Sequence, residues 1–189
     1  MKIILVRHGE SEHNSGKVTS KNSLLSRKGK IQAEHLGKRL KKEKIKVDKI
    51  YTSTLERSIH TAKIISKIIK VPITKSFDEL SEYPSINLKS FFVRLLNMRL
   101  VRLKRLLNKI TRERESKKTI LIVAHGVTNR IIIGHLLKIP MGKHLLQFWQ
   151  HNTAISILAW NKDFKNWGLE SMGDVYHLPK KLKWKELYE

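Results

Sequence analysis

The chain has 189 residues, of which 40% are hydrophobic and 29% charged, a composition typical of a globular protein with the core of one domain. It contains no cysteine, which excludes disulfides, thiolate metal centres and every enzyme whose nucleophile is a cysteine thiolate. Lys and Arg number 39 against 16 Asp and Glu, and the resulting formal net charge of +23 predicts nonspecific binding to polyanions.

No apolar run approaches the roughly 20 residues that a membrane helix needs. The N-terminal apolar run, residues 3–6, stops at Arg7 and is far too short for a signal peptide. We therefore expect a cytoplasmic protein with no membrane partner.

The first third of the chain alternates predicted strands and helices. Residues 2–6 are β-branched and almost wholly apolar, which indicates a buried parallel strand. A loop rich in Ser, Asn and Gly follows, and Ser26 then caps a helix whose apolar residues recur at helical spacing. Residues 48–52 form a short second strand, after which Thr54 caps the next helix.

The rest of the chain continues the alternation of strand and helix. Its predicted elements are a strand near a sheet edge at 71–77, a loop at 78–87, helices at 91–110 and 129–137, and strands at 119–124, 153–160 and 167–172. This order predicts the α/β class, with a three-layer α/β/α arrangement around a mainly parallel sheet and a single domain over residues 1–189.

Two of the apolar strands end in the same dipeptide, His8-Gly9 and His125-Gly126. Because ligands of open α/β sheets bind beyond the carboxyl ends of the strands, we expect the two histidines to face one pocket. The glycine after each histidine lets the backbone approach a ligand closely.

Two arginines stand near these histidines: Arg7 precedes His8, and Arg57 lies in the first turn of the helix after the second strand. Guanidinium groups match the geometry of phosphoryl oxygens, and their positive charge keeps a neighbouring imidazole neutral and nucleophilic. The leaving alcohol needs a proton, and Glu82 or Glu79 on the loop after the third strand can donate it. No metal is required for this chemistry, because the arginines and His125 supply the positive charge.

Several segments in order along the chain resemble those of the histidine phosphatase superfamily, which has the phosphoglycerate mutase-like fold. The strongest is Leu-Val-Arg-His-Gly-Glu-Ser-Glu-His-Asn at residues 5–14. The others are residues 24–33, 51–62, 77–82, 123–130 and 150–156.

The resemblance implies that His8 becomes phosphorylated during turnover and that Glu82 is the proton donor, with Glu79 as the alternative. It implies a phosphate pocket completed by Arg7, Arg57 and His125, with Asn14 and the Gly126 amide as further contacts. It implies no cofactor and no metal, and a small phosphorylated substrate.

The sequence departs from the family pattern at two places. After Glu82 the family often carries a glycine and a Trp-Glu-Gly run, where this chain has Tyr-Pro-Ser-Ile-Asn at residues 83–87. Before Leu24 the family usually has a glycine beside the phosphate, where this chain has Ser20 or Ser23. Phosphoglycerate mutases are generally longer, so the compact chain favours a phosphatase.

Residues 83–117 are expected to form a lid or cap segment within the domain. The helix at 91–110 is dense in leucine and in Lys and Arg, and three interpretations stay open for it. It packs on the sheet with its basic side in water, it is a lid that presents arginines to an anionic substrate, or it lies on a membrane surface.

We therefore expect a metal-independent phosphomonoester hydrolase that works through a phosphohistidine on His8. The first alternative is phosphoryl transfer of the phosphoglycerate mutase type. The second is a polyanion-binding or nucleic-acid-binding protein built on the same scaffold, for which the charge of +23 is the argument. A monomer and a homodimer are both compatible with the sequence.

Overall fold

The computed structural model describes residues 1–13, 16, 22–83, 90–140 and 148–183, with the backbone alone for residues 90–96. Six strands form one sheet in the order β3-β2-β4-β1-β5-β6. The strands are β1 (Lys2–Arg7), β2 (Lys49–Ser53), β3 (Ile73–Phe77), β4 (Thr119–Ala124), β5 (Ile155–Asn161) and β6 (Asn166–Asp174). The pairs from β3 to β1 are parallel, whereas β5 and β6 are added antiparallel, so the predicted mainly parallel sheet is confirmed with a mixed edge.

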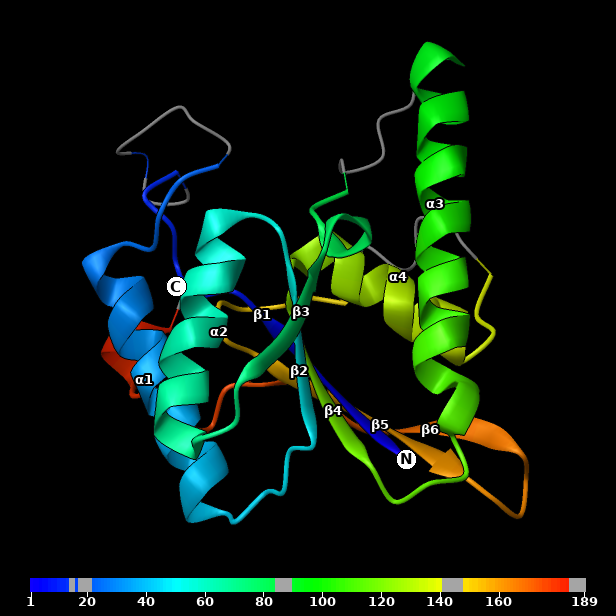
Figure 1. The fold of residues 1–189 in the computed structure, drawn as a ribbon. Helices are drawn as coiled ribbons and strands as arrows, with labels where there is room; N and C mark the ends of the chain where they lie inside the picture. The colour runs from blue at the N-terminus through cyan, green and yellow to red at the C-terminus, as the bar shows by residue number, and fades with distance from the viewer. Residues whose placement is uncertain (14–15, 17–21, 84–89, 141–147, 184–189) are drawn as a thin grey trace.

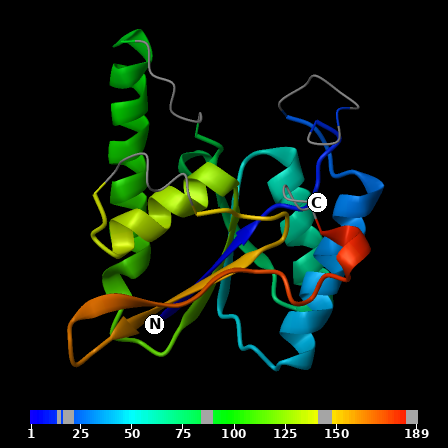
Figure 2. The ribbon, with the colours of Figure 1, turned by 180° about the vertical axis from the view of Figure 1, so that it is seen from behind.

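Helices cover both faces of the sheet, which confirms the predicted three layers (Figures 1 and 2). One face carries α1 (Arg27–Lys42) and α2 (Glu56–Ile69), and the other carries α3 (Ser90–Ile110) and α4 (Gly126–Leu136). Helix α3 extends along its axis well beyond the other helices (Figure 1).

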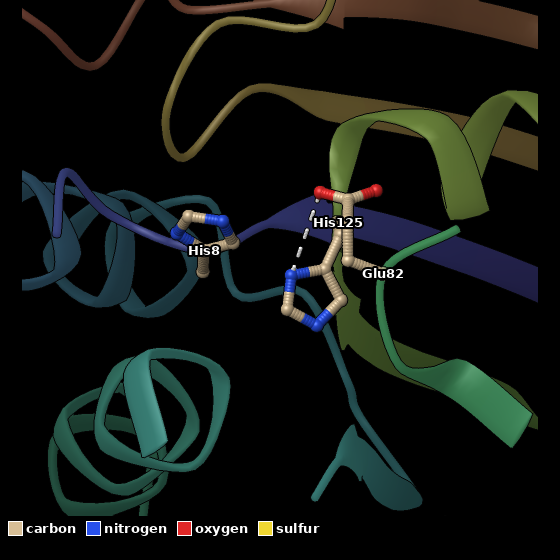
Figure 3. Close-up of side chains that lie close together, drawn as sticks. All are labelled: His8, Glu82 and His125. Atoms are coloured by element: carbon tan, nitrogen blue, oxygen red, sulfur yellow. Dashed lines mark ion pairs between the residues drawn. The ribbon is translucent and has the colours of Figure 1, made fainter. Parts of the chain in front are cut away.

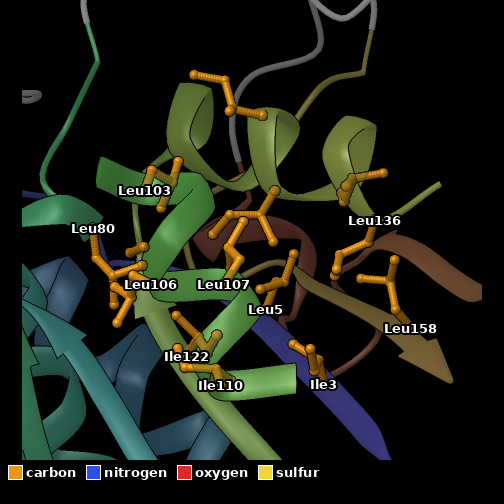
Figure 4. Close-up of a cluster of buried hydrophobic side chains, with 14 of the residues drawn as sticks. Ile3, Leu5, Leu80, Leu103, Leu106, Leu107, Ile110, Ile122, Leu136 and Leu158 are labelled. Carbon is orange, nitrogen blue, oxygen red and sulfur yellow. The ribbon is translucent and has the colours of Figure 1, made fainter. Parts of the chain in front are cut away.

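The alternation of side chains along the central strands divides the core between the two helical layers. Ile3 and Leu5 belong to a cluster with residues of α3 and α4 (Figure 4). Ile4 and Val6 belong to a second cluster, with residues of α1 and α2. A continuous apolar strand such as β1 is therefore required, because helices cover both of its faces.

Parallel pairing brings the carboxyl ends of three strands to one edge of the sheet. At the end of β1, Arg7 lies opposite Ala124 of β4. At the end of β2, Thr52 lies opposite Val123 of β4. The next residues along these strands, His8, His125 and Ser53, consequently emerge side by side.

The local predictions hold at Ser26 and fail at Thr54. Ser26 caps α1, where its Oγ accepts a hydrogen bond from the Gly29 amide at 3.0 Å. Helix α2 starts after Leu55 without a side-chain cap, because the Thr54 hydroxyl is engaged by the Ser81 hydroxyl at 3.1 Å. The helix predicted from residue 129 begins three residues earlier, at Gly126.

Two glycines allow the loop after β1 to lie directly on the first turn of α1. A Cβ at Gly29 would come within 1.9 Å of the carbonyl oxygen of Glu10. A Cβ at Gly9 would come within 2.5 Å of the carbonyl oxygen of Gly29. Both positions therefore require glycine for close backbone approach, and this approach fixes the position of the loop that carries His8.

Among the residues that the structure describes, no helix is both long and apolar enough to cross a membrane.

The substitution Gly29→Ala is expected to destabilise the protein, although alanine favours a helix over glycine by up to about 1 kcal/mol. The added methyl must displace backbone, so we expect the free energy of unfolding to fall by about 1–3 kcal/mol in urea titrations. Gly168→Ala is the control, because its Cβ would meet nothing nearer than a carbonyl oxygen at 4.0 Å. Equal stability of the two variants would contradict the close approach.

Candidate active site

His8 is buried at the end of β1, with both ring nitrogens engaged. Its Nδ1 lies 2.6 Å from the carbonyl oxygen of Gly9, and its Nε2 lies 3.1 Å from Nε of Arg57. A carbonyl only accepts and a guanidinium only donates, so the protonated nitrogen is Nδ1 and the lone pair is on Nε2. The side-chain amide of Asn152 donates to the carbonyl oxygen of His8 at 3.0 Å and holds the backbone of this residue.

His125 is fully buried beside His8, with a ring-centroid separation of 5.0 Å and an edge-on arrangement. Its Nε2 lies 2.8 Å from the hydroxyl of Ser53, the last residue of β2. Its Nδ1 faces the Glu82 carboxylate at 3.8 Å (Figure 3). The two predicted histidines thus face one another from neighbouring parallel strands.

Burial is the main cause that lowers the pKa of both histidines well below the usual value. The charges of Arg7 and Arg57 act in the same direction on each ring. Both imidazoles are therefore neutral at pH 7, and His8 keeps the lone pair that a nucleophile needs.

Arg7 and Arg57 are themselves withdrawn from water. Burial lowers the pKa of Arg7 to about 10 and also lowers the pKa of Arg57. Arg7 donates from Nη1 to the carbonyl oxygen of Gln150 at 2.5 Å. Both guanidinium groups remain charged at pH 7 and interact with the same carboxylate, Glu82.

Glu82 is the acidic side chain that the structure places at the histidines (Figure 3). Its Oε1 accepts a hydrogen bond from the amide of Val127, in the first turn of α4, at 3.2 Å. Burial raises the pKa of Glu82, although the arginines and this amide act in the opposite direction. A raised pKa favours a carboxyl group that exchanges protons near neutral pH.

Three further predicted residues have different outcomes. Glu79 points to the surface, where its carboxylate lies 3.5 Å from Arg102. Gly126 is the first residue of α4, beside the Arg7 side chain. Asn14 lies outside the described residues.

Three neighbours of the site were not predicted from the sequence: Ser53, Asn152 and Arg130. Arg130 donates from Nε to the carbonyl oxygen of Gly126 at 3.1 Å and interacts with Glu82. Arg130 belongs to the segment 123–130, which resembles the family segment around the second histidine. Its place four residues after Gly126, about one helical turn, is the feature of the sequence that could have indicated it. Ser53 and Asn152 also fall on segments that resemble the family, 51–62 and 150–156, but their contacts with the histidines arise only through the folding of distant parts of the chain.

The electrostatics of the site suit an anion. Within the described part of the chain, donor atoms of His8, Glu82 and His125 lie within 4.8 Å of one another, a spacing compatible with a metal ion. However, Nε2 of His8 is already in a hydrogen bond with Arg57, and the charges of three arginines, Arg7, Arg57 and Arg130, act on the Glu82 carboxylate. A cation would be repelled by these groups, whereas a phosphoryl group would be attracted.

A separate cavity of about 890 Å³ lies between α3, the end of α4 and the hairpin of β5 and β6. Among its lining residues are Lys104, Arg114, His135 and Trp167. It includes none of the site residues described above, so we do not place the chemistry there.

Comparison with known proteins assigns the family. A sequence model of the Histidine phosphatase superfamily (branch 1) matches residues 3–84 and 97–174. The chain belongs to the histidine phosphatase superfamily. The resemblance seen in the sequence is thereby confirmed, and the match includes the segments that carry both histidines, Arg57 and Glu82.

Two curated relatives of this histidine phosphatase superfamily member match a shorter part of the chain than the family model does. A 2,3-bisphosphoglycerate-dependent phosphoglycerate mutase of Hamiltonella defensa is 41% identical over 81 residues, which are 40% of this chain and 32% of that protein. Phosphoglycerate mutase 1 of Saccharomyces cerevisiae is 39% identical over 84 residues, which are 33% of its length. The matched part is therefore about a third of each mutase.

Solved structures share the fold over nearly the whole chain. A phosphoserine phosphatase from Entamoeba histolytica, in complex with 3-phosphoglyceric acid, superposes with a TM-score of 0.73 and 24% identity, covering 94% of this chain and 99% of that one. The α-ribazole phosphatase of Shigella flexneri gives 0.72 and 20% identity, covering 93% and 97%. At these identities the comparison establishes the fold.

The lowered pKa of His8 makes the stability of the protein depend on pH. In the unfolded chain a histidine titrates near pH 6.5. The unfolded state therefore binds more protons than the folded state below this pH, and stability falls as the pH falls. In His8→Gln this contribution is absent, so we expect the loss of unfolding free energy between pH 7 and pH 5 to be smaller, by at most about 2 kcal/mol. Urea titrations at several pH values measure it, and parallel curves for the two proteins would contradict a buried neutral His8.

Proposed function

We propose that this protein hydrolyses small phosphomonoesters without a metal ion, through a phosphohistidine formed at Nε2 of His8. The observation that carries the proposal is the pair of hydrogen bonds on His8. The carbonyl oxygen of Gly9 fixes the proton on Nδ1, so the lone pair of the ring is on Nε2, where it accepts a hydrogen bond from Arg57. A phosphoryl group bound there offers Arg57 charged oxygen acceptors in place of the imidazole.

In the first step, the lone pair of Nε2 attacks phosphorus in line with the ester oxygen. The nitrogen–phosphorus bond forms as the phosphorus–oxygen bond breaks, and the departing oxygen takes the proton of the Glu82 carboxyl group. Arg7, Arg57 and the amide of Gly126 stabilise the negative charge on the equatorial oxygens. The raised pKa of Glu82 supports its role as the acid.

In the second step, water attacks the phosphorus of phosphohistidine. The Glu82 carboxylate takes a proton from this water, the nitrogen–phosphorus bond breaks, and inorganic phosphate leaves. His125 stays neutral and lies against the transferring group, with its ring held by the Ser53 hydroxyl. Glu82 is preferred over Glu79 because the latter is paired with Arg102 at the surface.

Hydrolysis is preferred over mutase chemistry because the two solved structures described above, which share the fold over nearly their full lengths, are phosphatases by name. Local identity to two phosphoglycerate mutases favours the alternative, in which the phosphoryl group returns to another hydroxyl of a sugar acid. Isolated phosphohistidine protein distinguishes the two, since transfer to 3-phosphoglycerate faster than release of inorganic phosphate would support the mutase.

Replacement of the nucleophile is the direct test of the phosphohistidine. We expect His8→Ala to abolish hydrolysis of 4-nitrophenyl phosphate, because uncatalysed monoester hydrolysis is slower than the enzymatic reaction by factors of up to about 10²¹. The exposed Lys104→Ala is the control and should keep wild-type activity. EDTA should leave the wild-type rate unchanged. Normal turnover in His8→Ala would disprove the mechanism, and loss of activity in EDTA would disprove its metal independence.

Replacement of the proton donor should depend on the leaving group. For an alkyl phosphate, whose oxygen must be protonated as it leaves, we expect Glu82→Gln to lower kcat/KM by about 10²–10⁴-fold. For 4-nitrophenyl phosphate, whose leaving group departs as a stable anion, the loss should be much smaller, and kcat/KM reports only steps up to formation of the phosphoenzyme. Glu79→Gln is the matched control. An equal loss for both substrates would contradict the assignment of Glu82.

A further inference from the structure

The backbone of the loop that carries Glu82 is held by an arginine of helix α3. Arg99, on α3, donates from Nη2 to the carbonyl oxygen of Glu82 at 3.2 Å and lies 3.4 Å from that of Ser81. One guanidinium nitrogen therefore meets two successive carbonyl groups of the loop. The side chain of Arg99 is half-buried, which limits competition from water.

Tyr83 holds this arginine in place. Its ring is buried and lies beneath the Arg99 guanidinium, with 4.5 Å from the guanidinium carbon to the ring centroid. Its hydroxyl donates to the carbonyl oxygen of Arg99 at 2.9 Å. Cation–π stacking and the hydrogen bond together connect the residue after Glu82 to the main chain and side chain of α3. Burial also raises the pKa of Tyr83 to about 12, so this hydroxyl keeps its proton.

The same loop is fixed to the histidine on its other side. The Ser81 carbonyl also accepts from the Thr128 hydroxyl of α4 at 3.0 Å. The Ser81 hydroxyl lies 3.3 Å from the hydroxyl of Ser53, which contacts Nε2 of His125. The peptide before Glu82 is thus tied to His125 and α4, and the peptide after it is tied to α3.

Opposing influences act on the pKa of the Glu82 carboxyl group at this position. Burial disfavours its charge, and Arg7, Arg57 and the Val127 amide favour it. A small displacement of the loop changes the distance to His125 and to the leaving oxygen. Misplacement of a reacting group by about 1 Å can lower a rate by about 100-fold.

The contact between Arg99 and Tyr83 lies where this chain departs from the sequence pattern of its family. Tyr83 stands where the family often has glycine, and the family model leaves residues 85–96 unmatched between its two matched parts. Tyr83 and Arg99 come from the two sides of that stretch and contact each other. The position of Glu82 is therefore fixed by contacts made outside the unmatched stretch.

We propose that Arg99, held by Tyr83, is a positioning residue that keeps the Glu82 carboxyl group at the distance from His8 and His125 needed for proton transfer. This inference rests on the proposed function of Glu82 as the proton donor. The hydrogen bonds and the ring contact of the Arg99 side chain go to the loop backbone and to Tyr83, and its charge also acts to lower the pKa of His125. Through Glu82 it acts on the step in which the leaving oxygen is protonated and on the step in which water is deprotonated.

The test compares Arg99→Met with Arg102→Met, which removes an exposed arginine one helical turn along α3. We expect Arg99→Met to lower kcat/KM for an alkyl phosphate by about 10–100-fold and for 4-nitrophenyl phosphate by less than about threefold. Arg102→Met should match the wild type with both substrates. If Arg99 had only a structural role, Arg99→Met would lower kcat/KM equally for both substrates.

Two milder variants separate positioning from folding. Arg99→Lys keeps the charge and one donor without the planar stacking group, and we expect it to restore part of the alkyl phosphate activity. Tyr83→Phe keeps the ring and loses one hydrogen bond, which predicts a loss of about fivefold for the alkyl phosphate. Thermal unfolding of all variants identifies any that fail to fold, and the comparison is then made on those that fold.

A crystal structure of Arg99→Met, or of Arg99→Lys if the first does not fold, gives a reading that does not depend on activity. We expect the Glu82 carboxylate to have moved away from Nδ1 of His125, from which it is 3.8 Å in the wild type. An unmoved carboxylate overturns the positioning role, as does a wild-type ratio of alkyl to aryl activity. An inactive wild type overturns the proposed function, while the crystal structure still decides whether Arg99 positions Glu82.

Discussion

The hydrogen bond between Nδ1 of His8 and the carbonyl oxygen of Gly9, 2.6 Å long, is the contact on which the chemistry of this site depends. It determines which ring nitrogen carries the proton and so which one has a lone pair. The carbonyl is in place because Gly9 lies against the backbone of Gly29, an approach that any side chain would prevent. The N-terminal turn of α1, the loop after β1 and the orientation of one imidazole are thus a single structural unit.

A second constraint is the concentration of positive charge at a buried edge of the sheet. Arg7 and Arg57 lose water as they enter it, and burial lowers the pKa of both. Their charges are balanced in part by the carboxylate of Glu82. Burial, together with the charges of the arginines, keeps the imidazoles neutral. Such a site attracts negative charge, and the phosphoryl group of the proposed substrate would supply it. This is the physical link between a buried cationic site and the phosphoryl chemistry proposed for a member of the histidine phosphatase superfamily.

The loop that carries Glu82 is held by two helices that pack on the same face of the sheet, α3 and α4. Thr128 and Val127 hold it from the start of α4, and Arg99 holds it from α3. Between them, Ser53 connects the loop to His125. The position of the proposed proton donor is consequently set by helix packing on one face of the sheet, whereas that of the proposed nucleophile is set by the loop that packs on α1 on the other face.

Local chemistry made much of this predictable from the sequence. The continuous apolar runs of β1 and β4 had to be strands covered on both faces, and histidines directly after them had to emerge at one sheet edge. The cap at Ser26 could also be predicted, since its acceptor and donor are three residues apart. Thr54 could not be assigned correctly, because the hydroxyl it meets belongs to Ser81, 27 residues away.

The sequence by itself therefore determined the family, the layered α/β fold and the histidines and arginines that converge at one edge of the sheet. The tertiary structure decided the tautomer of His8, the placement of Glu82 rather than Glu79 beside His125, and the contact of Arg99 with the loop that carries Glu82. Each of these depends on distances between groups far apart in the chain, such as the 72 residues that separate Ser53 from His125. Residue type and spacing specify local conformation, whereas a hydrogen bond between distant segments exists only once the core has brought them together.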